Sequence, residues 1–138
     1  MKKAILIVER IELAFLKKLA FESNYYNDVL LKESVRHLME EFKGAVVVEE
    51  DSIPEDVIRL YSKVSVRLNN GWEKQFKIVL PKEGNLKEDL ISVLSPMGIA
   101  LYGHRKGDVF SWKFPLGKQQ ITILHVENIV RNQKTLEL

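Results

Sequence analysis

The segment that most constrains the fold runs from Ser95 to Asp108 and has the sequence SPMGIALYGHRKGD. Ser95 is a favourable helix N-cap, and Pro96 suits the first helical position because its missing N–H costs nothing there. Gly103 can end the helix in a left-handed conformation, and Gly107 lies in the turn toward the next segment. The sequence therefore predicts a helix of about two turns, fastened between strands and buried against a sheet.

The segments around this helix alternate between apolar and polar residues, as half-buried strands do. Asn70-Gly71 is the strongest short hairpin signal in the chain and joins two of these segments. Five segments are expected to be strands: residues 63–68, 72–80, 89–94, 109–114 and 120–129. Together with the short central helix they predict an α+β domain built on an antiparallel sheet.

Two amphipathic helices are expected before this domain. The apolar stripe of the first helix is Val8, Ile11, Phe15 and Leu19, and that of the second is Leu31, Val35, Leu38 and Phe42. Turn-forming residues separate them, and Gly44 supplies the stop. We therefore expect a short coiled-coil hairpin over residues 1–44, with arms of about 20 Å. A connecting segment over 45–62, the sheet domain over 63–130 and a tail over 131–138 complete the predicted organisation.

One pattern in the sequence resembles a known family. The run Ser-Pro-x-Gly-x-Ala-Leu-x-Gly-x-x-x-Gly-Asp, which begins at Ser95 and is followed by Trp112 and Gly117, resembles the C-terminal domain of the Gre transcript-cleavage factors and of Rnk, the regulator of nucleoside diphosphate kinase. Residues 53–58 (IPEDVI) and 62–64 (SKV) are similar to the join that leads into that domain in Rnk. The resemblance implies an FKBP-like fold preceded by a coiled-coil hairpin, closest to that of Rnk.

The resemblance also implies a partner, RNA polymerase. In the Gre factors an acidic residue followed by Ser-Pro contacts the coiled coil at the rim of the polymerase secondary channel. Ser95 and Pro96 match this pattern, but Leu94 stands where the acid would be, as in Rnk. The contact implied for this chain is Leu94, Ser95, Pro96 and Met97, without the acidic partner. The plainer interpretation is that Ser95 and Pro96 start the helix, and both interpretations can hold together.

The tip of the hairpin carries two acids, Glu22 and Asp28, and two adjacent tyrosines, Tyr25 and Tyr26. In the Gre factors a pair of acids at the tip of a long coiled coil enters the secondary channel and helps to hold a catalytic magnesium ion. The arms expected here are too short for that reach, so capping and solvation explain the two acids better. Adjacent exposed tyrosines are costly unless they pack or bind.

We therefore expect a Rnk-like transcription regulator that binds RNA polymerase and competes with other channel-binding factors without RNA cleavage, and not an enzyme. One alternative is a Gre-type cleavage factor that acts through Glu22 and Asp28. Another is an FKBP-like prolyl isomerase or peptide-binding module. Its groove would need convergent aromatic side chains, for which the candidates are Trp72, Phe76, Phe110, Trp112 and Phe114.

Composition sets the remaining expectations. The net charge of +2 provides no basic field for holding a phosphate backbone, so direct sequence-specific binding of nucleic acid is not expected. The chain has no cysteine and no long apolar run, which predicts a soluble cytoplasmic protein without a membrane segment. His37, His104 and His125 are expected to have no carboxylate at ligand spacing, so no metal, cofactor or catalytic residue is predicted.

Overall fold

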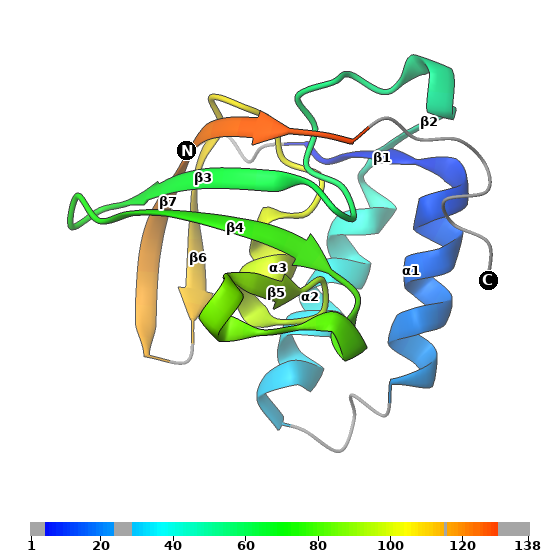
Figure 1. Cartoon of the computed structure of the whole chain (residues 1–138). Helices are drawn as coiled ribbons and strands as arrows, with labels where there is room; N and C mark the ends of the chain where they lie inside the picture. Colours follow the sequence, from blue (N-terminus) through cyan, green and yellow to red (C-terminus); the bar gives the residue numbers. More distant parts are fainter. Residues whose placement is uncertain (1–4, 24–28, 115, 130–138) are drawn as a thin grey trace.

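A five-stranded sheet forms the C-terminal half of the chain, in the strand order β5-β4-β3-β7-β6. The computed structural model describes residues 5–23, 29–114 and 116–129. Helix α3 (Pro96–Leu101) lies against this sheet, with the two N-terminal helices beyond it (Figure 1). The predicted α+β class is therefore confirmed. The strands are β3 (Lys63–Leu68), β4 (Glu73–Val79), β5 (Leu90–Ser92), β6 (Val109–Phe114) and β7 (Gly117–Glu127).

The predicted antiparallel sheet is correct for three of the four strand pairs and wrong for one. β3 pairs antiparallel with β4 and β7, and β6 pairs antiparallel with β7. β5, in contrast, runs parallel to β4, so the sheet is mixed. The reason lies in the connection between them, where two short 3₁₀ turns, η3 (Pro81–Glu83) and η4 (Leu86–Glu88), bring the chain back so that β5 runs beside the last three residues of β4, from Lys77 to Val79. Parallel neighbours need such a crossover, whereas a tight hairpin would have made them antiparallel.

The N-terminal hairpin consists of α1 (Arg10–Glu22) and α2 (Val29–Lys43), and α2 ends beside Gly44 as predicted. A small parallel sheet closes its open end, where β1 (Ile7–Glu9) pairs with β2 (Val46–Val48). Glu9 begins α1 by accepting hydrogen bonds from the amides of Ile11 and Glu12 at 2.7 and 2.9 Å. The hairpin is thus held at both of its connections to the rest of the chain.

One hydrophobic core spans the hairpin and the sheet domain. Leu16 from α1 and Leu38 from α2 are fully buried in the same cluster as Ile58, Leu101 and Ile123. The hairpin therefore shares its hydrophobic core with the sheet domain. The boundaries proposed for the units, 1–44, 45–62, 63–130 and 131–138, stay a prediction.

The apolar stripe predicted for the first helix is correct at Val8 and Phe15, which are 1% and 8% exposed, and wrong at Ile11. Ile11 is 40% exposed, whereas the buried positions of α1 include Leu13, Leu16 and Ala20. Glu12, the neighbour of Ile11, faces inward instead, and its side chain is fully buried. No helix in the described part of the chain is both long enough and apolar enough to cross a membrane.

Candidate functional site

The start of α3 is fixed to β5 by a cap that the sequence predicted. The Ser95 hydroxyl accepts a hydrogen bond from the Gly98 amide at 3.1 Å and donates one to the Ser92 carbonyl at 2.6 Å. A Cβ on Gly98 would lie 2.1 Å from that carbonyl oxygen, so only glycine lets the helix approach β5 this closely. Pro96 then occupies the first turn. The Ser-Pro-x-Gly pattern therefore has a structural role at this site.

An uncharged pocket of about 430 Å³ lies beside this helix start. Met97 and Pro96 are half-buried at its edge, and Leu86 of η4 is 83% exposed. None of the ten residues that line it is charged, although 29% of the chain is. Such a pocket can accept an apolar side chain from a partner. Its lining is Phe76, Gly84, Asn85, Leu86, Leu90, Ile91, Ser92, Ser95, Pro96 and Met97.

Three of the four residues proposed as the polymerase contact lie at this pocket. Leu94 does not, because its side chain is 3% exposed and belongs to the core, while its amide donates to the Ser92 hydroxyl at 3.0 Å. Sequence reasoning missed Leu86 as a pocket residue, and it named Phe76 only for the alternative peptide-binding groove. An isolated leucine in the otherwise polar loop before β5 was the available signal for Leu86.

The hairpin tip falls mostly outside the described residues, since Tyr25, Tyr26 and Asp28 are not among them. Glu22 is the last residue of α1 and is exposed, with one carboxylate oxygen 3.9 Å from the Lys18 ammonium. This geometry is that of an exposed intrahelical ion pair. Glu22 thus lies on the surface, and Asp28, the second acid of the proposed pair, lies outside the described residues.

A buried ionic network holds the far end of α3, and sequence reasoning missed it. The Arg59 guanidinium, 4% exposed, donates to Glu12 at 2.8 Å and to both oxygens of Glu50 at 2.7 and 2.8 Å. Tyr102 donates its hydroxyl proton to Glu12 at 2.6 Å, and the Leu60 amide donates at 2.9 Å. Burial alone would lower the pKa of Arg59, but hydrogen bonds and charges of Glu50 and Glu12 outweigh it and raise that pKa. The network joins α1, the connecting segment and α3.

The expectation that no histidine has a carboxylate at ligand spacing is wrong for two of the three. His37 lies 3.1 Å from Glu41, and His104 lies 3.1 Å from Asp108, each four residues along the chain. Sequence reasoning did not consider this spacing across a helical or turn segment. Within the described ranges no group of three or more His, Cys, Asp or Glu side chains could hold a metal ion. His125 is exposed on β7.

Asp108 accepts hydrogen bonds from His104 and from the Arg105 amide at 3.1 and 2.9 Å. Burial acts to raise the pKa of Asp108, but these hydrogen bonds and the nearby positive charges outweigh it, so the pKa lies below its ordinary value. His104 is 7% exposed and stacks on the Phe110 ring with the centroids 3.7 Å apart. This pair therefore stabilises the turn that follows α3.

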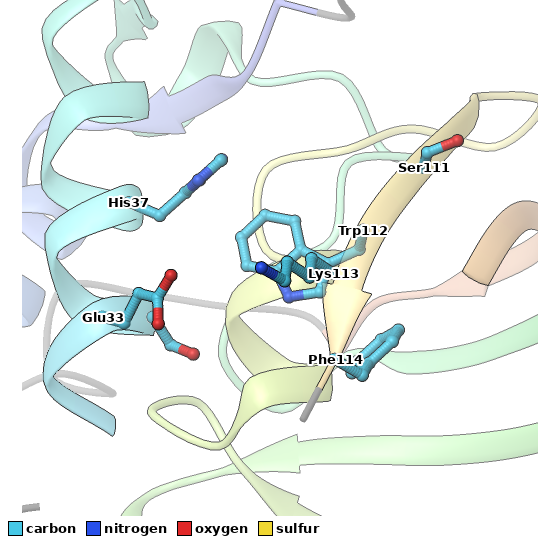
Figure 2. Close-up of a pocket in the computed structure, with 7 residues that line it drawn as sticks. Glu33, His37, Ser111, Trp112, Lys113 and Phe114 are labelled. Atoms are coloured by element: carbon cyan, nitrogen blue, oxygen red, sulfur yellow. The ribbon is translucent and has the colours of Figure 1, made fainter. Parts of the chain in front are cut away.

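The aromatic residues proposed for a peptide-binding groove do not share one groove. Trp72 is 45% exposed near the β3–β4 turn, and Phe110 stacks on His104. Phe76 lines the pocket beside Met97, whereas Trp112 and Phe114 line a separate cavity between α2 and β6 (Figure 2). Convergence of aromatic side chains, which an FKBP-like peptide site would need, is not found among them.

Comparison with known proteins decides the family. The family model for the C-terminal domain of the transcription elongation factors GreA/GreB matches residues 53–128. The chain belongs to the GreA/GreB family. The matched residues include β3 to β7 and α3, and therefore also the helix start and its pocket.

Individual GreA/GreB relatives agree with this assignment. The chain is similar to transcription elongation factor GreA of Chloroflexus aurantiacus, with 34% identity over 111 residues, 76% of this chain and 71% of that protein. It is 33% identical over 91 residues to GreA of Thermotoga neapolitana, which covers 65% of this chain and 58% of that protein. The solved structure of a GreA/GreB elongation factor from Nitrosomonas europaea superposes with a TM-score of 0.70 at 26% identity, over 91% of this chain and all of that one. Coverage that large includes most of the helical hairpin as well as the sheet domain.

Proposed function

We propose that this GreA/GreB-family protein is a transcription regulator that binds RNA polymerase at the rim of the secondary channel. It competes there with other channel-binding factors and does not itself promote RNA cleavage. The observation that carries the proposal is the uncharged pocket beside Ser95, Pro96 and Met97. These residues match the stretch that resembles the polymerase contact of the Gre factors.

The chemistry of this surface favours an apolar contact. Leu94, which replaces the expected acid, is buried, and no charged residue lines the pocket. Leu86 and Met97 therefore supply the binding energy by removing apolar surface from water. An interface of this kind depends little on ionic strength, because salt screens charges and leaves apolar contacts in place.

The packing of the hairpin supports a role without cleavage. Helices of 13 and 15 residues are each only about 20 Å long. Leu16 of α1 and Leu38 of α2 belong to the shared core, so the hairpin is held on the domain. Arms this short do not extend to a distant catalytic centre.

Binding to purified core RNA polymerase tests the proposed contact. The fluorescently labelled wild type should bind and be displaced by a GreA cleavage factor, whereas Pro96→Asp should bind at least about tenfold more weakly. Aspartate is favourable in the first turn of a helix, so this variant should keep the fold. Pro81→Asp, at the exposed start of η3 and outside the pocket, is the matched control. Failure of the wild type to bind, or equal loss in both variants, would overturn the proposal.

The alternative function is that of a Gre-type cleavage factor, since the relatives are named as transcription elongation factor GreA and the resemblance to the Gre factors implies cleavage. Backtracked transcription complexes with Mg²⁺ separate the two functions. If the wild type shortens the stalled transcript and the Glu22→Ala, Asp28→Ala double variant does not, the hairpin tip acts in cleavage. If the transcript is unchanged while binding is intact, the protein occupies the channel without cleavage.

A further inference from the structure

The two edges of the five-stranded sheet are finished differently. At the β5 edge the outer backbone groups already have partners, because Leu90 exchanges two hydrogen bonds with Asn85, at 2.9 and 3.0 Å. The Ser92 carbonyl accepts another from the Ser95 amide at 2.9 Å. At the opposite edge β6 pairs only with β7 and has six residues, whereas β1, β2 and β5 have three each. β6 therefore forms the longest strand edge without a neighbour in the described part of the chain.

Three residues of β6 direct their backbone groups toward this open edge. In an antiparallel pair, hydrogen-bonded and non-hydrogen-bonded positions alternate along each strand. The Asp108 carbonyl accepts from the Ile123 amide at 2.9 Å, which fixes the phase of this alternation at the start of β6. The even-numbered residues of β6 therefore bond to β7, and the N–H and C=O groups of Val109, Ser111 and Lys113 point away from it. Among the described residues, no other element supplies these groups with a hydrogen-bond partner.

A cavity of about 320 Å³ lies along this edge. Four consecutive residues of β6, Ser111 to Phe114, line it. Successive side chains of a strand point to opposite faces of the sheet, so one cavity reaches all four residues only along the open edge. Helix α2 forms the opposite wall with Glu33, Ser34 and His37 (Figure 2). A free strand edge thus faces a helix across open space.

We propose that this edge binds an extended segment of a partner protein, which joins the sheet as an additional strand beside β6. In this mode of recognition, main-chain hydrogen bonds supply the affinity, and alternate side chains of the segment supply the selectivity. No groove of convergent aromatic side chains is required. The site is also separate from the pocket beside α3, since the two share no lining residue.

The two faces of β6 define which segment fits. On the inner face the added strand lies beside Trp112 and Phe114, and aromatic residues pair favourably with apolar side chains across strands. On the outer face Lys113 lies opposite Lys118 of β7, and neither lysine has an ion pair in the ranges that the structure describes. Like charges directly opposite each other are unfavourable, whereas opposite charges attract. The fitting segment therefore alternates apolar residues with acidic ones.

A second copy of this chain fits the same edge less well. In an antiparallel pair of two β6 strands centred on Ser111, Lys113 of one copy lies opposite Val109 of the other. β6 contains no acidic residue, so the facing lysines of each copy stay uncompensated. The charge pattern favours a different protein, whose strand brings the carboxylates.

A designed peptide tests this edge on the whole chain. The probe is the acetylated peptide Glu-Val-Glu-Phe-Glu-Val-Glu, and hydrogen exchange followed by NMR locates it. We expect saturable binding that protects the amides of Val109, Ser111 and Lys113. The amides of Phe110 and Trp112, which already bond to β7, should change little. No saturable binding, or protection at other residues without these three, would overturn the proposal.

Two altered peptides separate strand pairing from charge attraction. A peptide methylated at its backbone nitrogens keeps the side chains but has no donors, so it should bind at least about tenfold more weakly. A peptide with lysine in place of every glutamate should bind about fivefold more weakly. Undiminished binding of the methylated peptide would mean that charge alone attracts the probe, and strand pairing would be rejected.

Matched variants test the edge from the side of the protein. Ser111→Pro removes an outward N–H and should weaken binding at least about tenfold, while the β6–β7 ladder loses no hydrogen bond. Ser111→Ala keeps the backbone groups and should bind like the wild type. Lys113→Glu should reverse the preference between the glutamate and lysine peptides, and this result does not depend on how well the proline variant folds. Unchanged binding in Ser111→Pro, or an unchanged preference in Lys113→Glu, would contradict the assignment of this edge.

Discussion

The two ends of α3 have opposite chemistry. At its C-terminal end Tyr102 is 1% exposed and donates to Glu12 in a network of buried charges that partner one another. At its N-terminal end Pro96 and Met97 lie half-buried at a pocket with no charged lining residue. Buried charges with complete partners fix architecture, whereas exposed apolar surface beside a rigid element is suited to binding. One short helix is thus anchored at one end and presents a surface at the other.

The anchored end should give the largest stability effect. Arg59→Met removes the only cation that contacts the buried carboxylates of Glu9 and Glu12 in the described residues. We expect the free energy of unfolding in urea to fall by about 3 to 5 kcal/mol, because two buried charges lose their compensation. Arg67→Met removes an exposed pair with Glu73 and should cost about 1 kcal/mol or less. Similar losses in the two variants would show that the network is not the anchor.

The binding end has its own structural requirement at Gly98. In Gly98→Ala the new Cβ must move away from the Ser92 carbonyl oxygen, which would otherwise lie 2.1 Å from it. We expect a loss of about 2 to 3 kcal/mol in the same urea experiment, since backbone must shift to remove the clash. Gly44→Ala is the control, because its nearest contact at 3.9 Å leaves room for a methyl group. A loss no greater than that of the control would mean that the close approach of α3 to β5 is not required.

These two ends also show what the sequence could and could not predict. Ser95, Gly98 and Gly103 have local roles in capping, close approach and chain reversal, so the pattern of residue types was sufficient to predict the helix. Gly103 has a φ of 82°, the left-handed conformation expected for it. Asn70-Gly71 was likewise sufficient for the β3–β4 hairpin, because its turn is formed by adjacent residues.

The network around Arg59 could not be predicted, because its members lie far apart in the sequence. Glu12 and Arg59 are separated by 47 positions, and Glu12 and Tyr102 by 90. On a helical wheel an isolated glutamate is assigned to the solvent face, so the buried position of Glu12 on α1 was not predicted. The pocket at Leu86 was missed for the same reason, since it forms only when the loop before β5 meets α3.

The turn after α3 should give a smaller, pH-dependent effect. The pKa of Asp108 is below its ordinary value in the folded state, so its contribution is complete above the unfolded pKa of about 3.9 and is lost as the pH falls through the folded pKa. His104, the Arg105 amide and the Arg105 charge are the groups that lower it. Asp108→Asn should therefore cost about 1 kcal/mol at pH 7 and progressively less below about pH 4.

Urea titrations at several pH values measure this difference directly. Asp51→Asn, at an exposed position in the short 3₁₀ turn η2 (Glu50–Ser52), provides the comparison for a simple loss of charge. A cost for Asp108→Asn that stays constant from neutral pH to pH 3 would contradict the proposed role of the ionised carboxylate.

The smallest stability effect is expected at Leu86, where the effect on binding should be large. Leu86 is 83% exposed, so Leu86→Ser should change the free energy of unfolding by no more than about 0.5 kcal/mol. The same change removes the most exposed apolar side chain of the pocket beside α3, and affinity for RNA polymerase should fall about tenfold. Leu116→Ser is a suitable control, because Leu116 is also fully exposed but lies outside that pocket. A loss of affinity without a loss of stability would identify Leu86 as a contact residue. Unchanged affinity in Leu86→Ser would instead place the polymerase contact elsewhere on the molecule.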